Sequence, residues 1–148
     1  SLVQMQEERL FQAEGRPRLV AVRCIEGPSK RAEVELEREG HIYVGAAHSS
    51  DADAVRLVCM ATIEAMGQVL GERVTYHIED VARLTISGME AIAVAVTVNF
   101  ETVKETLLGI CQVHTEEVDA AARATLSALN RRLLILKQEP LSQPTAAK

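Results

Sequence analysis

The chain has 148 residues, a formal net charge of −5, and a composition that is 47% hydrophobic but only 3% aromatic. This length suits one domain, and the composition is typical of a globular protein with a core of Val, Leu, Ile and Ala. The acidic balance argues against a nucleic-acid partner, and no stretch approaches the roughly 20 apolar residues of a membrane span. We therefore expect no membrane partner and, without a signal-peptide pattern, a cytoplasmic location.

Residues 1–15 carry a weak apolar pattern and are predicted to form an N-terminal extension that ends at Gly15. Three segments with strand patterns follow. The second alternates Ala, Val and Leu with three glutamates, as a strand with one buried face does. Gly40 predicts a tight hairpin between the second and third strands. The three predicted strands are residues 19–25, 32–38 and 42–47.

A helix is predicted after the third strand. Ser50, followed by Asp51 and Asp53, is typical of an N-cap with acid in the first turn. Gly71 is a typical residue just beyond a helix end. Between them, apolar residues recur at helical spacing and predict a stripe that faces the sheet. The stripe consists of Val55, Val58, Cys59, Thr62, Met66 and Val69.

The second half of the chain has the same order of patterns. Three strands are predicted at residues 81–87, 91–100 and 105–113, and a helix from residue 115 to about residue 134. The strand 91–100 is bulky on one face and alanine-rich on the other, so we expect both faces to be covered. The second helix is also alanine-rich. Such surfaces suit a second layer of the same chain or a homodimer partner. The polar tail, residues 137–148, is predicted to be disordered.

The order of elements repeats because the sequence itself repeats. The motif ATIEAM returns as ATLSAL, and YVGA returns as LLGI, with offsets of 63 and 64 residues. Gly45 and Gly109 are equivalent in this alignment and are predicted to permit close packing of strand and helix. The matched segments are residues 61–66 with 124–129, 43–46 with 107–110, 34–36 with 98–100, and 19–22 with 83–86.

Two copies of a unit that cannot bury its own apolar face tend to form one domain. We therefore predict an α+β fold over residues 16–136, built from two pseudo-repeated strand-strand-strand-helix units. The sheet should be mostly antiparallel, with the helices packed on one side.

No pattern in the chain predicts catalysis, a metal or a cofactor. The four histidines lack the close paired spacing of a zinc site. Cys24, Cys59 and Cys111 lie in apolar segments, which raise the pKa of a thiol, so we interpret them as free buried thiols. The chain has neither a Gly-x-Ser-x-Gly elbow nor a phosphate-binding glycine motif. We expect a protein that is not an enzyme.

The segment from His114 to Asn130, HTEEVDAAARATLSALN, resembles a signature near the end of 2-isopropylmalate synthases. In that family a pattern close to S-T-D-[IV]-[IV]-x-A-S-x-x-A-Y-[LIV]-x-A-[LI]-N opens the last helix of the C-terminal regulatory domain. The resemblance extends over roughly residues 17–134. It implies two strand-strand-strand-helix units, a homodimer, and binding of leucine near the loops that precede the helices. Citramalate synthases carry a similar domain that senses isoleucine. The family's catalytic barrel has no counterpart in this chain.

Three departures from the family fall where a ligand would bind. Residues 47–50 (AHSS) replace a glycine-rich G-[ND]-G-P segment, of which only Asp53 and Ala54 match the end. Thr125 stands where the family has tyrosine. Residues 88–91 (GMEA) shorten the loop between the first two strands of the second unit.

Helix N-termini offer free N–H groups and a partial positive charge to a carboxylate. Two such ends follow histidines in equivalent loops, and we hypothesise that they bind a small apolar acid against Ala46, Ala54, Ile110 or Val118. The alternative is that Ser50 and Thr115 only cap their helices. The candidate ligand-binding residues are His48, Ser49, Ser50, Asp53, Ala54, His114, Thr115, Glu116 and Val118.

Two functions remain open at this point. The first is a non-catalytic regulatory module that senses a small branched amino or keto acid. The second is a homodimerisation or scaffolding module with no ligand site, which the lost glycine-rich loop favours.

Overall fold

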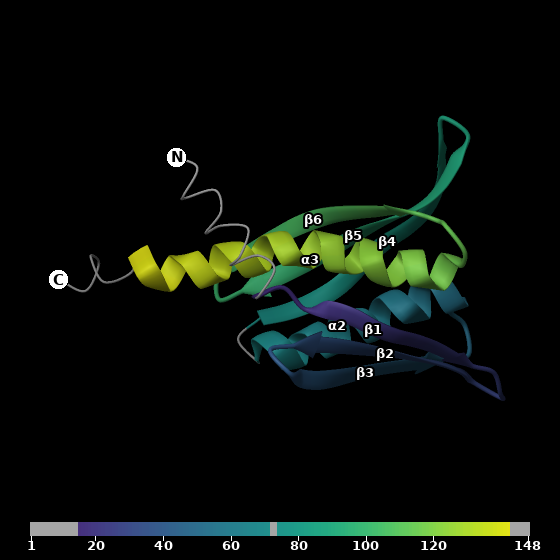
Figure 1. The fold of residues 1–148 in the computed structure, drawn as a ribbon, viewed down its shortest axis with the longest axis horizontal. Coiled ribbons are helices and arrows are strands. Elements are labelled where there is room, and N and C mark those ends of the chain that lie inside the picture. Colours follow the sequence, from purple (N-terminus) through teal and green to yellow (C-terminus); the bar gives the residue numbers. More distant parts are fainter. Residues whose placement is uncertain (1–14, 72–73, 143–148) are drawn as a thin grey trace.

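The computed structural model describes residues 15–71 and 74–142. Within these ranges it has two antiparallel three-stranded sheets and two helices, arranged as two successive strand-strand-strand-helix units (Figure 1). The α+β class and the repeat predicted from the sequence are confirmed. Residues 1–14 of the predicted extension and residues 143–148 of the predicted tail lie outside the described residues.

The first unit follows its sequence pattern closely. On the second strand Ala32, Val34 and Leu36 are fully buried, while the alternating glutamates face away. Glu39 and Gly40 have φ angles of 53° and 83°, which is the two-residue turn that suits the twist of a hairpin. The elements are β1 (Arg18–Ile25), β2 (Lys30–Arg38), β3 (His41–Ser49) and α2 (Ala54–Leu70).

The second unit has longer elements than predicted. Its first strand begins at Val74, because Val74, Tyr76 and Ile78 already alternate with polar residues. A β-bulge between Ile78 and Asp80 interrupts this alternation, so the sequence pattern starts again only at Val81. The elements are β4 (Val74–Ile86), β5 (Met89–Phe100), β6 (Val103–Gln112) and α3 (Glu117–Ser142).

The last helix corrects one boundary. It continues to Ser142, so residues 137–142 are helical where the composition predicted the start of a disordered tail. The sequence RRLLILKQE at residues 131–139 consists of residues with good helix propensity, which explains the continuation.

The two helices form a layer between the two sheets (Figure 1). α2 packs on β2 and β3, α3 packs on β5 and β6, and the helices pack on each other; α2 also contacts β4. Each sheet therefore has an inner face on the helices and an outer face that points away from them. The helices cover one side of each sheet, as predicted.

Two glycines mark the closest approach of strand and helix. A Cβ atom at Gly45 would overlap the carbonyl oxygen of Ala61, and one at Gly109 would overlap that of Ala124. These equivalent contacts confirm the repeat through β3, β6 and the helices. They also confirm the predicted packing role of the two glycines.

The predicted repeat alignment is wrong in the first two strands of each unit. Gly45 pairs with Val34, whereas Gly109 pairs with Val94, so β2 and β5 correspond with an offset of 60 residues rather than 64. The β5–β6 hairpin has two more residues in each arm than the β2–β3 hairpin, which shifts every residue before its turn. A match of short apolar segments cannot detect this change in hairpin length.

Candidate functional site

The loop before α2 is arranged around side chains of the chain itself. The helix begins after Asp53, whose Oδ1 accepts a hydrogen bond from the backbone N–H of Arg56 at 2.9 Å. Ser49 Oγ accepts from the N–H groups of Asp51 and Ala52 at 3.0 and 3.2 Å. The prediction that Ser50 is the N-cap is therefore wrong. The turn that Ser49 stabilises places the first helical residue after Asp53 rather than after Ser50. The Asp53 carboxylate therefore accepts a helix N–H group that the sequence hypothesis assigns to a bound ligand.

The loop before α3 is more open. His114, Thr115 and Glu116 are exposed, and the Glu116 carbonyl accepts from the N–H of Ala120 at 3.3 Å. Because α3 begins at Glu117, the cap position is Glu116, and Thr115 precedes it. The interpretation of Thr115 as the helix cap is therefore also wrong. Val118, predicted as a ligand contact, is half-buried and packs against the hydrophobic core.

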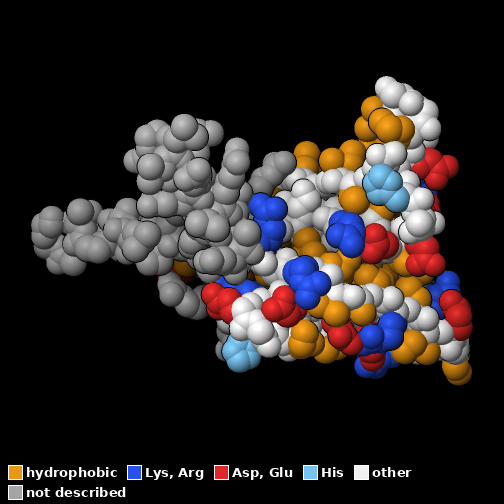
Figure 2. Space-filling model, viewed as in Figure 1, with side chains coloured by type: hydrophobic (Ala, Val, Ile, Leu, Met, Phe, Trp, Pro, Cys, Tyr) orange, Lys and Arg blue, Asp and Glu red, His pale blue; other side chains and the backbone are white. Residues whose placement is uncertain are grey.

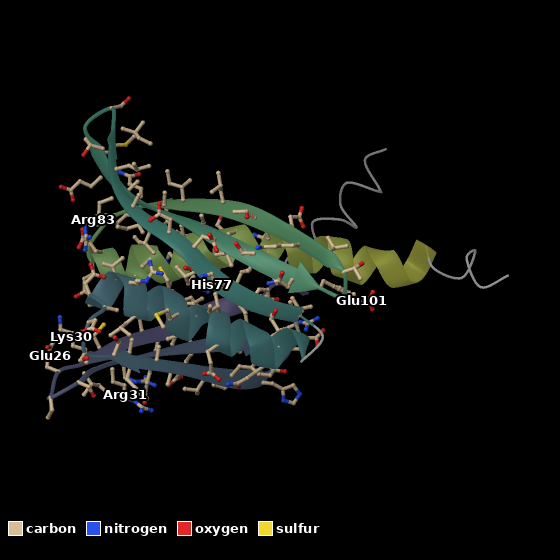
Figure 3. All side chains as sticks on the ribbon, turned by 180° about the vertical axis from the view of Figure 1, so that it is seen from behind. Glu26, Lys30, Arg31, His77, Arg83 and Glu101 are labelled. Carbon is tan, nitrogen blue, oxygen red and sulfur yellow. The ribbon has the colours of Figure 1, made fainter. Side chains whose placement is uncertain are left out.

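An arginine that the sequence reading missed joins the starts of the two helices. Arg83 on β4 places Nε 2.8 Å from Oε2 of Glu117 and Nη2 3.4 Å from Oδ2 of Asp53 (Figure 3). Glu117 and, to a smaller extent, Asp53 raise the pKa of this guanidinium. The N–H of Arg56, followed by Arg83, holds the pKa of the Asp53 carboxyl below its usual value. The carboxylates of Asp53 and Glu117 thus lie at the positive N-terminal ends of the two helices, and Arg83 pairs with both.

A groove runs along α2 between β3 and the first half of β4. This open groove has a volume of about 1140 Å³, somewhat more than the usual 300–1000 Å³ of a small-molecule pocket. Of the predicted ligand-binding residues only His48 lines it among the described residues; Ala46, predicted as an apolar contact, lines it too. The other lining residues come from β3, from α2 and its C-cap, and from β4. They are Ala47, Arg56, Met60, Ile63, Glu64, Gly67, Gln68, Gly71, Val74, Thr75, Tyr76, His77 and Ile78.

The groove is cationic at one end and apolar along its floor. Arg56, in the first turn of α2, donates from Nη2 to the Ile78 carbonyl at 3.2 Å. His48 and His77 lie in the walls, and Figure 3 labels His77 on β4 beside α2. Met60 and Ile63 supply apolar surface. This arrangement can hold a carboxylate at the Arg56 end with an apolar group beside it.

The outer face of the second sheet is apolar around the alanines of β5, while Thr97 and Asn99 with their strand neighbours make the rest of the face polar. The alternation in β5 places Ala91, Ala93 and Ala95 on this face, and large side chains flank them on β4 and β6. Among the described residues no further layer covers the face, so the expected neighbour of the alanine side is not part of the described chain. The exposed large side chains are Leu84, Ile86, Met89, Leu108 and Ile110, with Leu108 the most exposed at 65%.

The equivalent face of the first sheet is ionic. Arg23 pairs with Glu33 and Glu35, and Arg31 pairs with Glu33 at 3.0 Å. Arg31 is the main cause that lowers the pKa of the Glu33 carboxyl. Figure 2 shows mixed charges over the first unit and hydrophobic side chains on the projecting β4–β5 hairpin. The outer face of the first sheet thus combines ion pairs with exposed apolar residues on β3, Ile42 and Val44, whereas within the described residues no ion pair lies on the apolar part of the second sheet.

The cysteines differ from one another in exposure. Cys59 is fully buried, Cys111 is half-buried, and Cys24 is exposed, so the prediction of three buried thiols is wrong for Cys24. Its place near the end of the edge strand β1 leaves it partly open. Burial raises the pKa of all three thiols. Among the described residues no three His, Cys, Asp or Glu side chains gather as a metal site.

The sequence matches no protein-family model and no curated protein. Over the described residues, neither α2 nor α3 combines the length and apolarity that a membrane crossing requires.

Proposed function

We propose that this chain is a non-catalytic module that forms a homodimer through its second sheet. The observation that carries the proposal is the exposed apolar row on β6, where Leu108 is 65% and Ile110 is 49% exposed. Contiguous apolar patches on soluble proteins often mark interaction sites. The equivalent face of the first sheet combines ion pairs with Ile42 and Val44 on β3, and Leu108 is more exposed than either of these two residues.

Two further observations support the proposal. The resemblance of the second helix to the regulatory domain of 2-isopropylmalate synthases favours a dimer, because that domain dimerises. The raised pKa of the Cys59 thiol disfavours a thiolate nucleophile and fits a non-catalytic role.

The homodimer is tested by placing a charge at equivalent positions of the two sheets. Leu108→Lys should raise the dimer dissociation constant at least tenfold, because two cations would be buried or brought close together at the interface. Val44 occupies the equivalent outward position on β3 and is 42% exposed, so Val44→Lys is the matched control and should leave the dissociation constant unchanged. Analytical ultracentrifugation measures both. Equal dissociation constants for the two variants and the unaltered chain would contradict an interface on the second sheet.

A second candidate function is the binding of a small branched amino or keto acid in the groove. It is favoured by the presence of Arg56, His48 and His77 in one groove with apolar residues such as Met60 and Ile63. The groove exceeds the size of one amino acid, so such a ligand would occupy only the cationic end. The groove contains His48, which the sequence hypothesis also named. The rest of this candidate site lies along the side of α2 and not at the helix N-termini.

Ligand-induced stabilisation tests this candidate. An acid present at 100 times its dissociation constant should add about 2.7 kcal/mol to the free energy of unfolding, which raises the melting temperature by several degrees. His48→Ala should weaken the effect, whereas His114→Ala should not, because His114 lies outside the groove. Differential scanning fluorimetry with leucine, isoleucine, valine and their keto acids gives the readout. Absence of any shift, or an equal loss in both variants, would exclude the groove as the site.

A further inference from the structure

Edge strands carry unpaired backbone groups, and proteins usually block them to prevent unwanted pairing. The edge of β3 is blocked by side chains from α2. Glu64 Oε1 accepts from the N–H of Ala46 at 2.8 Å, and Gln68 Nε2 donates to the carbonyl of Val44 at 2.8 Å. These two side chains occupy the groups that an added strand would need.

Two other edges are interrupted in different ways. β4 has a bulge after Ile78, and the carbonyl of Ile78 is already bonded by Arg56. β1 has a bulge between Leu19 and Ala21 and lies beside α3. Bulges twist an edge and break the regular spacing of its hydrogen-bonding groups.

The edge of β6 has neither protection among the described residues. Its ladder with β5 runs without a register shift from Val103 to Gln112. The N–H of Val113 bonds to the carbonyl of Glu90 at 2.8 Å. Because backbone groups alternate sides along a strand, the odd-numbered residues of β6 face β5, and Leu108 and Ile110 point their backbone groups outward.

Within the part of the chain that the structure describes, no side chain of α3 blocks this edge as Glu64 and Gln68 of α2 block β3. Glu64 on α2 corresponds to Ser127 on α3, whose side chain is too short to reach the neighbouring strand as Glu64 does. Within the described residues, no side chain bonds to the backbone of Leu108 or Ile110. Residues 106–112 carry no charge, so this edge meets another copy of itself without like-charge repulsion.

We propose that the dimer forms by antiparallel pairing of β6 with β6 of a second copy, which joins the two second sheets into one six-stranded sheet. This inference rests on the proposed homodimer and specifies how it is built. A two-fold axis lets the same N–H and C=O groups serve both copies. Leu108 and Ile110 of one copy then lie beside the same two residues of the other copy, which partly covers the most exposed apolar residue, Leu108, and its neighbour. Blocked edges on β3 and β4 stop further addition of strands.

A proline tests the backbone pairing directly. Ile110→Pro removes an N–H that makes no bond within the described chain, so the monomer should fold while the dimer dissociation constant rises at least 100-fold. Ile110→Ala keeps the N–H and removes most of the side chain, so its dissociation constant should rise less than that of the proline variant. Sedimentation velocity gives the constants, and circular dichroism checks the fold. Dimerisation of a folded Ile110→Pro variant with an unchanged constant would overturn the inference.

A second variant decides the question if the proline prevents folding. Ser127→Glu gives α3 the carboxylate that α2 uses to block β3, and it should make the chain monomeric. Ala93→Arg, on the outer face away from the edge, should leave the dimer intact. If Ser127→Glu remains dimeric and Ala93→Arg becomes monomeric, the sheets pair face to face: the edge inference fails and the homodimer stands. If the unaltered chain is monomeric, the proposed function itself fails.

Discussion

Asp53 fixes the start of α2 through its bond to the N–H of Arg56, although Ser50 is the more obvious cap in the sequence. The choice depends on Ser49, whose hydroxyl holds residues 51 and 52 in a turn. Arg83 was also missed, because its partners Asp53 and Glu117 lie 30 and 34 residues away in the chain. Single charges whose partners are distant in sequence leave no local pattern.

Replacement of Asp53 with alanine should lower the free energy of unfolding by about 1 kcal/mol at pH 7, as the loss of an N-cap does. Folding lowers the pKa of the Asp53 carboxyl. The ionised carboxylate therefore stabilises the folded state at pH values above the pKa of about 3.9 in the unfolded chain, and this stabilisation is lost as the pH falls through the lower pKa of the folded state. The difference between Asp53→Ala and the unaltered chain should therefore shrink below pH 4. Urea denaturation across this range gives the readout. Asp51→Ala, which removes an exposed carboxylate that is not the cap, is the control; an equal cost for both would contradict the capping role.

At the scale of elements, the contact between β6 and α3 depends on the absence of one side chain. Gly109→Ala should lower the free energy of unfolding by about 1–3 kcal/mol, because the added methyl group overlaps the Ala124 carbonyl and forces strand and helix apart. Gly67→Ala is the control. Gly67 lies inside α2 with no atom near its hypothetical Cβ, so the same substitution should stabilise by about 0.5–1 kcal/mol. Chemical denaturation measures both, and a Gly109→Ala chain as stable as the original would exclude the close contact.

The order of strands and helices was predictable from local periodicity, although the start of α2 and the end of α3 were not. The equivalence of Gly45 with Gly109 was predictable from the repeat. The start of β4 was not, because the bulge at residue 79 breaks the alternation between Ile78 and Val81. The alignment of β2 with β5 failed for a related reason: the length of a hairpin arm does not appear in a match of short segments. Periodicity identifies an element, but pairing between strands sets its register.

At the scale of the molecule, the repeat yields two sheets whose inner faces are alike and whose outer faces differ. The alternation in β2 and β5 predicted which residues point inward, and the alanines of β5 indicated an unusual second face. The groove along α2 could not be foreseen, because it arises where the edge strands β3 and β4 of separate units flank one helix. Of the predicted ligand-binding residues, all within the described chain, only His48 lines the groove. The sequence hypothesis includes it because it precedes a helix N-terminus.

The mass of the unaltered chain in solution tests the central claim most directly. Sedimentation equilibrium at tens of micromolar should give twice the chain mass of 16.2 kDa, with dissociation on dilution described by a single monomer–dimer constant. Larger assemblies should not appear, since β3 and β4 are blocked. A mass of 16.2 kDa throughout that range would contradict the homodimer and leave the apolar face of the second sheet for another partner.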